Sequence, residues 1–256
     1  MPEPLILVSN DDGIDSNGIY VLAMEMMKLG EVFVVAPDRQ QSAVGHALTV
    51  SKPLRISKYQ RIDIKNGFAI NGTPADCVKL AISRILHRKP DLVVSGINHG
   101  QNTSVNMLYS GTVSAATEGM LVGIPSMAIS LSSYDLNSDM SASGIYSYRI
   151  AKELLENKMP LGTFINVNIP NLEIGKIKGM RITKQSNSSW DDAYEKRIDP
   201  FGKEYYWFSG VYNTNDNNPE SDDIAVTEGF VSITPVHYNL TNFDAIDKLK
   251  SIFDSD

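Results

Sequence analysis

The chain is 256 residues long, which is enough for one large α/β domain or for one domain with an appendage. It is 42% hydrophobic and 21% charged, a composition that excludes wholesale disorder. The formal net charge of −7 argues against a nucleic-acid polymer as the main partner, because such binding uses a basic surface.

Cysteine content and the N-terminal segment bear on the compartment. Cys77 is the one cysteine, so an intrachain disulfide and a cysteine-rich zinc site are excluded, and its apolar helical surroundings predict a buried side chain. The first residues lack the basic region and cleavage site of a signal peptide, and no apolar run reaches membrane-spanning length. We therefore expect a cytoplasmic protein with no membrane partner.

Short apolar runs alternate with longer amphipathic ones from residue 5 to about residue 170, which predicts repeated β-α units around a parallel sheet. The predicted strands are almost continuously apolar, as strands buried on both faces should be, and cover residues 5–9, 32–36, 92–95, 126–131 and 164–169. The predicted helices cover residues 18–28, 74–87, 112–122 and 144–157. The second is the clearest, with Thr73 as its cap, Pro74 at its first position and Asp76 completing a capping box.

Two segments interrupt this alternation. Residues 47–71 predict extended strands with a turn at Lys65-Asn66-Gly67, as an excursion off the sheet. Aromatic arms around residues 199–202 predict a long hairpin, and the polar residues 213–223 predict a mobile loop.

A strand at residues 230–234 and a helix near residues 242–253 are predicted to end the chain. We accordingly divide it into a catalytic core, residues 1–180, and a C-terminal region, residues 181–256, with the hairpin, the closing strand and the helix.

Three of the predicted strands run into polar clusters. Asn10-Asp11-Asp12-Gly13 follows the first strand, and the other two clusters are residues 37–42 and 96–102. Because ligands bind beyond the carboxyl ends of parallel strands, we expect the three clusters to share one edge of the sheet. Two adjacent carboxylates beside Ser and Asn oxygens favour a hard cation, Mg²⁺, Mn²⁺ or Ca²⁺. The alternative is that Asp11 and Asp12 only cap the following turn.

Other cofactor motifs do not fit this segment. In a calcium-loop frame with Gly18 at its sixth position, Gly13 and Met24 would occupy the first and twelfth positions, where acidic ligands are needed. Neither a dinucleotide fingerprint nor a P-loop occurs.

A second chemical feature is the turn Ser110-Gly111-Thr112 before the third helix. Free backbone N–H groups and two hydroxyls at a helix N-terminus form an anion pocket. An ordinary N-cap is the alternative interpretation. A metal site beside a phosphate-sized pocket indicates phosphoryl chemistry.

These motifs resemble those of the SurE (survival protein E) family of nucleotidases. The resemblance rests on residues 9–13, 36–42, 71–77, 95–98 and 109–113, with a weaker segment at residues 231–235. It implies a Rossmann-like, three-layer α/β/α fold with a mostly parallel sheet and a C-terminal hairpin and helix extension. It also implies a divalent-metal phosphomonoesterase acting on nucleoside monophosphates, and a homodimer or homotetramer formed through C-terminal segments. The choice between 5′- and 3′-monophosphates and an activity on short polyphosphate are left open.

By position, the residues that match the family's metal ligands are Asp11, Asp12, Ser42 and Asn98. Those that match its phosphate-side residues are Asn102, Ser110, Gly111 and Thr112. We expect one Mg²⁺ or Mn²⁺ ion, with Asp11, Asp12 and Asn102 as the catalytic groups.

Several mechanistic alternatives remain open. A bound water can attack phosphorus with Asp11 or Asp12 taking its proton, or one of these carboxylates can attack directly. His46 and His99 are candidate acids, although packing roles are commoner for such residues. Tyr109 and Tyr134 can stack on a nucleobase, but core packing is the commoner role of a single tyrosine. The competing function is a non-catalytic nucleotide or metal sensor.

Overall fold

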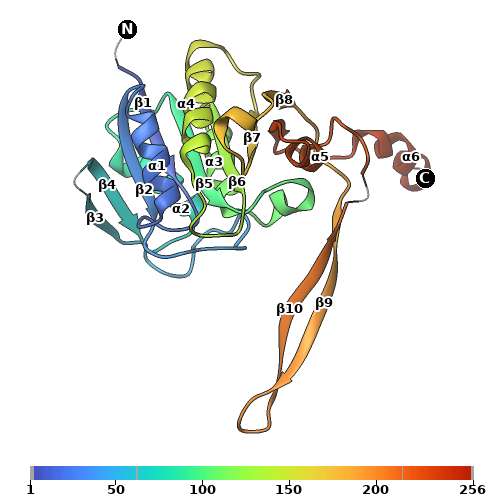
Figure 1. Cartoon of the computed structure of the whole chain (residues 1–256). Coiled ribbons are helices and arrows are strands. Elements are labelled where there is room, and N and C mark those ends of the chain that lie inside the picture. Colours follow the sequence, from blue (N-terminus) through green and yellow to red (C-terminus); the bar gives the residue numbers. More distant parts are fainter. Residues whose placement is uncertain (1–2, 62, 215, 255–256) are drawn as a thin grey trace.

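The fold is seen in a computed structural model that describes residues 3–61, 63–214 and 216–254. Nine strands form the main sheet in the order β3-β4-β2-β1-β5-β6-β7-β11-β8 (Figure 1). Strands β4, β2, β1, β5, β6 and β7 are parallel, and β3 and β11 are antiparallel to their neighbours β4 and β7. The strand bounds are β1 Leu5–Ser9, β2 Glu31–Pro37, β3 Ile56–Arg61, β4 Ile64–Ile70, β5 Leu92–His99, β6 Ser126–Ser132, β7 Thr163–Pro170, β8 Met180–Ile182 and β11 Val231–His237.

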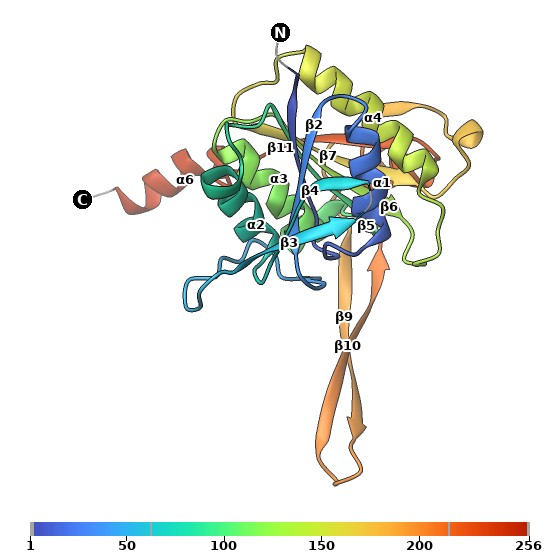
Figure 2. The same cartoon turned by 90° about the vertical axis from the view of Figure 1, so that its left-hand side faces the viewer.

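Helices cover both faces of the sheet, which makes a three-layer α/β/α arrangement (Figure 2). One face carries α1 (Asn17–Met26) and α4 (Ser141–Glu156), and the other carries α2 (Pro74–Leu80) and α3 (Gly111–Leu121). In the central strand β1, Ile6 and Val8 pack toward the α1 side, whereas Leu5 and Leu7 pack toward the α2 side. This alternation explains why β1 is apolar at every position. The Rossmann-like α/β fold is therefore confirmed.

The predicted helices and their caps agree with the structure, apart from one early ending. Thr73 and Asp76 form the capping box that begins α2, and Cys77 is fully buried. The α-helix ends at Leu80, where the continuous sequence pattern predicted a helix to residue 87. A π-helical turn, Ala81–Ile85, takes up most of the remainder.

The prediction for residues 47–71 is wrong in two respects. Strands β3 and β4 extend the main sheet, because β4 pairs in parallel with β2, so the segment is no excursion off the sheet. The predicted turn at residues 65–67 lies inside β4, and the chain reverses between Arg61 and Ile64. Gly67 is needed there for another reason: a Cβ atom would lie 2.7 Å from the carbonyl oxygen of Tyr59.

The C-terminal part includes the predicted hairpin, formed by β9 (Ser189–Ile198) and β10 (Glu204–Asn213), which projects away from the body (Figure 1). The predicted polar loop is shorter than expected, because Asp222 and Asp223 are buried and begin helix α5 (Asp222–Thr227). Helix α6 (Phe243–Phe253) ends the described chain. The division at residue 180 stays a prediction; in the structure β8 and β11 belong to the main sheet.

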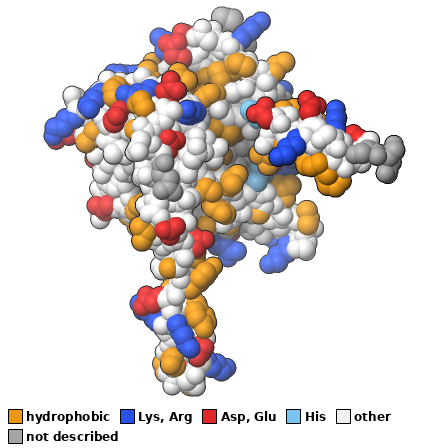
Figure 3. Space-filling model, turned by 90° about the vertical axis from the view of Figure 1, so that its right-hand side faces the viewer, with side chains coloured by type: hydrophobic (Ala, Val, Ile, Leu, Met, Phe, Trp, Pro, Cys, Tyr) orange, Lys and Arg blue, Asp and Glu red, His pale blue; other side chains and the backbone are white. Residues whose placement is uncertain are grey.

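Exposed aromatic and aliphatic side chains line the hairpin (Figure 3). They include Tyr194, Phe201, Tyr206, Trp207, Phe208 and Val211. Over the residues that the structure describes, none of the helices combines the length and the apolar character needed to span a membrane.

Candidate functional site

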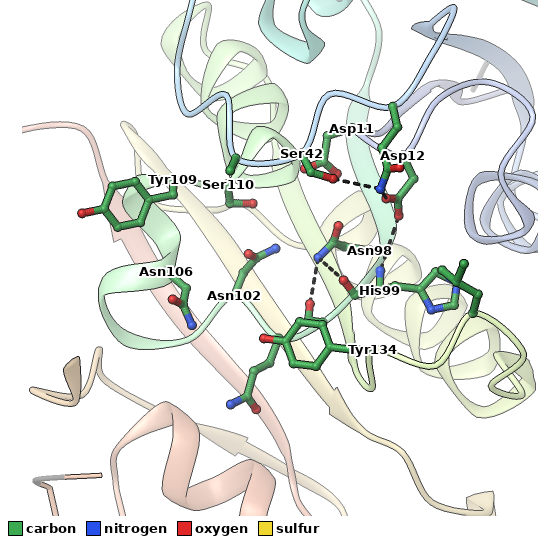
Figure 4. Close-up of a pocket in the computed structure, with 15 residues that line it drawn as sticks. Asp11, Asp12, Ser42, Asn98, His99, Asn102, Asn106, Tyr109, Ser110 and Tyr134 are labelled. Carbon is green, nitrogen blue, oxygen red and sulfur yellow. Dashed lines mark hydrogen bonds between the residues drawn. The ribbon is translucent and has the colours of Figure 1, made fainter. Parts of the chain in front are cut away.

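A cavity of about 350 Å³ lies at the carboxyl edge of the central strands, where the three polar clusters meet (Figure 4). Such a volume suits a small-molecule ligand. Its lining includes all four predicted metal ligands, Asp11, Asp12, Ser42 and Asn98, together with Asn102 and Ser110. The predicted convergence of these six residues is therefore seen, as expected for the carboxyl ends of parallel strands.

Asp11 is the most enclosed acid of the cavity. Its side chain packs against Gly111 at the start of α3, and its Oδ1 atom accepts a hydrogen bond from the hydroxyl of Thr112. Burial raises the pKa of Asp11 to about 6, although the Thr112 hydrogen bond opposes this shift. A raised pKa means that burial disfavours the negative charge of this carboxylate when no cation is near. A bound cation would offset that cost, which suits Asp11 as a metal ligand.

Asp12 is linked to the neighbouring segments by weaker contacts. Its Oδ2 atom accepts from the backbone N–H of His99 at 3.4 Å, and its Oδ1 atom accepts from Nε2 of Gln40 at 3.3 Å. The same Gln40 nitrogen also donates to Oγ of Ser42 at 2.9 Å. Burial raises the pKa of Asp12 as well. Gln40 therefore connects the predicted ligands Asp12 and Ser42. The sequence motif at residues 37–42 did not predict this role.

Asn98 presents an oxygen to this group. Its Nδ2 atom donates to the backbone carbonyls of His99 and Gly100 at 3.1 and 2.8 Å, which fixes the amide orientation. The amide oxygen consequently points toward Asp11 and Ser42 (Figure 4). A register irregularity between β5 and β6, located between Ser95 and Asn98, places the residue there.

The donor set fits a hard divalent cation. Two carboxylates, one hydroxyl and one amide oxygen surround the same part of the cavity, and oxygen donors are those that Mg²⁺ and Mn²⁺ prefer. The lining as the structure describes it holds neither Lys nor Arg to balance the two acids. Among the described residues no group of three or more His, Cys, Asp and Glu side chains could hold a metal; the proposed set draws half its donors from Ser and Asn.

The start of α3 forms another part of the wall. Ser110 caps the helix, because its Oγ atom accepts from the backbone N–H of Val113 at 3.1 Å. Gly111 and Thr112 lie behind Ser110, outside the residues that line the cavity. Thr112 is fully buried and its hydroxyl is used on Asp11. The N-cap interpretation of Ser110 is thus confirmed, while the contact of these three residues with phosphate stays a prediction.

Asn102 is held in place by hydrogen bonds to side chains of strands β6 and β7. Its backbone N–H donates to Oδ1 of Asn168 at 2.7 Å, and its carbonyl accepts from Nδ2 of Asn166 at 2.6 Å. Its own Nδ2 atom donates to Oγ of Ser130 at 2.9 Å. Sequence reasoning missed the two asparagines of β7, although paired Asn residues inside an apolar strand are an unusual pattern.

The candidate aromatic and histidine residues lie in different surroundings. Tyr109 and Tyr134 line the cavity and are 59% and 71% exposed, so the core-packing interpretation is wrong for both. His99 also lines the cavity. His46 does not: its Nε2 atom lies 2.8 Å from Oε1 of Glu118, away from the acids.

Comparisons with known proteins agree with this geometry. Residues 6–192 match the family model described as Survival protein SurE. Proteins named 5′-nucleotidase SurE from Christiangramia forsetii and Flavobacterium johnsoniae are 46% and 44% identical to this chain, and each alignment covers 97% of the chain and 96% of the relative.

A solved structure, that of the SurE protein from Aquifex aeolicus, matches with a TM-score of 0.85 at 41% identity, covering 97% of this chain and 99% of that one. The match thus extends over nearly the whole length of both chains. The chain belongs to the SurE family.

Proposed function

We propose that the protein is a divalent-metal-dependent 5′-nucleotidase that hydrolyses nucleoside monophosphates to nucleoside and phosphate. The observation that carries the proposal is the convergence of Asp11, Asp12, Ser42 and Asn98 beside the N-terminus of α3 in one cavity. The relatives named 5′-nucleotidase support the same reaction for this chain.

The four oxygen ligands would hold one Mg²⁺ or Mn²⁺ ion. Such an ion supplies Lewis acidity toward a phosphoryl group and lowers the pKa of water. Thr112 keeps Asp11 in a fixed orientation, and Gln40 does the same for Asp12 and Ser42. A fixed ligand geometry avoids reorganisation during the reaction. The arrangement is compatible with either acid taking a proton from water or attacking phosphorus directly.

The phosphate is assigned to the Ser110 side of the cavity. Helix α3 directs its free N–H groups and the positive end of its dipole toward this wall. Asn102 adds a polar side chain from the same side. Tyr109 and Tyr134 offer exposed aromatic surface on which a nucleobase can stack.

Two further expectations belong to this proposal. The exposed aromatic hairpin supports assembly into a homodimer or homotetramer. The acidic net charge supports mononucleotides over nucleic-acid polymers as substrates. A cytoplasmic location remains our expectation.

The testing experiment measures phosphate release from nucleoside 5′-monophosphates with Mg²⁺ or Mn²⁺, and again after chelation. We expect turnover with metal and none with excess chelator. Asp12→Asn should weaken metal binding by about tenfold or more in calorimetry. Asp15 is a nearby exposed acid that does not line the cavity, so the control variant Asp15→Asn should leave metal binding unchanged. Nucleotide binding without turnover would favour the sensor function, and full activity in chelator would exclude the metal mechanism.

A further inference from the structure

A buried polar network joins the base of the β9–β10 hairpin to one wall of the cavity. Its centre is Asp222, whose side chain is fully buried at the start of α5. Oδ2 of Asp222 accepts from the backbone N–H of Ser104 at 3.0 Å, and Oδ1 accepts from the backbone N–H of Ser186 at 3.1 Å and from that of Asp223 at 2.9 Å. One carboxylate therefore holds two segments that are 82 residues apart in the chain.

Ser104 has an unusual backbone conformation. Its φ angle is 52°, in the left-handed region that residues with a side chain rarely adopt. Such a conformation persists only where the surroundings impose it. Here Asp222 accepts the Ser104 N–H, the Ser104 hydroxyl donates to the carbonyls of Ser186 and Ser188, and Gln185 donates to the Ser104 carbonyl.

The position of Ser104 matters for the cavity. Asn102 and Asn106, two residues away on either side, both line the cavity, as do Tyr109 and Ser110 farther along the chain. Asn102 is fixed by β7, and Asn106 accepts a hydrogen bond from the indole N–H of Trp190 on β9 at 2.8 Å. Ser104 is the anchor between these two, so a change of its backbone would displace Asn106 and the tyrosine that follows.

We propose that Asp222 is a positioning residue for the cavity: by accepting the Ser104 N–H it holds residues 103–109 in the conformation that places Asn106 and Tyr109 on the substrate wall. The base of the hairpin is part of the same support. Asp222 itself lies outside the cavity lining. The kinetic test of this role rests on the proposed function, whereas the test by hydrogen exchange does not.

The neighbouring Asp223 provides a matched control. It is also buried, but it accepts from Ser188 Oγ at 2.6 Å, from the Tyr212 hydroxyl at 3.1 Å and from the backbone of Ile224, and among the contacts of the described residues none joins its side chain to Ser104. Asp223→Asn therefore perturbs a buried carboxylate of the same network without removing the acceptor of the Ser104 N–H.

The test compares Asp222→Asn with Asp223→Asn by steady-state kinetics, with rates normalised to folded protein, and by hydrogen exchange of the peptides covering residues 102–109. An amide at position 222 places an NH₂ group against at least one of the three backbone donors that the carboxylate accepts from. We expect KM for a nucleoside monophosphate to rise about tenfold while kcat changes less than about threefold. The reason is that the substitution displaces the wall that binds the substrate but leaves Asp11 and Asp12 in place. Exchange in residues 102–109 should be faster, and exchange in α1 should be unchanged. Asp223→Asn should change both readouts clearly less than Asp222→Asn does, because the Ser104 N–H keeps its acceptor.

A second pair of variants keeps the proposal testable if Asp222→Asn does not fold. Ser104→Pro removes the N–H and the left-handed conformation while leaving Asp222 intact, and it should reproduce the KM and exchange changes. Glycine adopts φ near 52° freely and keeps the N–H that Asp222 accepts, so Ser104→Gly in the otherwise wild-type chain should raise KM less than Ser104→Pro does.

Folded Asp222→Asn and Ser104→Pro with wild-type KM and wild-type exchange would overturn the proposal. If the wild-type protein turns over no nucleotide, the proposed function fails separately, and the exchange data still decide the positioning role.

Discussion

The hydroxyl of Thr112 donates a hydrogen bond to Oδ1 of Asp11, across 101 residues of sequence. Thr112 is in the first turn of α3, and Asp11 follows the central strand β1. The contact joins the helix that forms the predicted anion site to the carboxylate that is predicted to bind the metal. Thr112 therefore acts on the site through Asp11, while the phosphate contact that its motif indicated stays a prediction.

Removing this hydroxyl should impair the enzyme without changing the shape of the side chain. Thr112→Val removes this side-chain donor from the buried Asp11, and a hydrogen bond to a charged group contributes about 1.5–3 kcal/mol. We expect kcat/KM to fall roughly 10- to 100-fold. Thr112→Ser keeps the hydroxyl and should stay within a few-fold of wild type. Equal kcat/KM for folded Thr112→Val and wild type, with folding checked by circular dichroism, would contradict this role.

Gly111 should not tolerate even a methyl group. A Cβ atom there would lie 2.7 Å from Cβ of Asp11 and 3.0 Å from Cγ of Pro74, so Asp11 would have to move. Because small displacements of catalytic groups are costly, we expect Gly111→Ala to reduce kcat/KM on the order of 100-fold. Gly175 supplies the control, because a Cβ atom added there would meet nothing within 4 Å, and Gly175→Ala should keep full activity. Parallel activity losses in both variants would argue against a specific clash.

Much of the fold and of the site could be predicted because the signals are local. The strands β1, β2, β5, β6 and β7 are buried on both faces, so their apolar runs stand out. The parallel sheet then brings Asp11, Asp12 and Asn98 to one edge without further information.

What could not be predicted depends on contacts between distant segments. The pattern of residues 47–71 shows extended chain but not that β4 pairs with β2. Asp222 and Asp223 follow a polar stretch typical of a loop, and the burial of Asp222 depends on the backbone donors of Ser104, Ser186 and Asp223, the first of which is distant in the chain. The donation of Thr112 to Asp11 is equally invisible, because no sequence periodicity connects a strand end with a helix start 101 residues away.

The loop that carries Ser42 should be stabilised by Glu118. This buried acid of α3 lies 2.8 Å from Nε2 of His46 and 3.0 Å from Nζ of Lys79. Burial works to raise the pKa of Glu118, but the hydrogen bonds from His46 and Lys79 outweigh it and hold that pKa below its usual value. Glu118→Gln should lower the free energy of unfolding by about 1–3 kcal/mol and should increase hydrogen exchange in residues 43–49.

A surface ion pair provides the comparison for Glu118. Lys152 and Glu156 of α4 pair at 3.8 Å, with side chains that are 51% and 58% exposed. Glu156→Gln should change the free energy of unfolding by less than about 1 kcal/mol, because exposed pairs contribute little. Both variants are measured by urea denaturation. Similar small losses for the two would show that the Glu118 cluster does not hold the loop.

The stability of the protein should depend on pH through Asp222. Burial raises the pKa of this carboxyl from 3.8 to about 6, against the opposing hydrogen bonds from Ser104, Ser186 and Asp223, and the charge of Asp223 raises it further. Between about pH 4 and pH 6 the folded state therefore holds a proton that the unfolded state has released. The free energy of unfolding must then fall as the pH rises through this window. A pKa difference of this size corresponds to about 3 kcal/mol.

The difference between wild type and Asp222→Asn isolates this contribution from other titrating groups. Asparagine carries no proton that is lost over this range, so its stability lacks the Asp222 contribution. We expect the destabilisation caused by Asp222→Asn to be greatest near pH 4 and to shrink by on the order of 2–3 kcal/mol by pH 7, with no further change up to pH 8. Urea denaturation of both proteins at intervals of half a pH unit measures it. A constant difference from pH 4 to pH 7 would mean that Asp222 has the same pKa in the folded and unfolded states. The lowering of its pKa by the three N–H donors would then have to cancel fully the rise caused by burial.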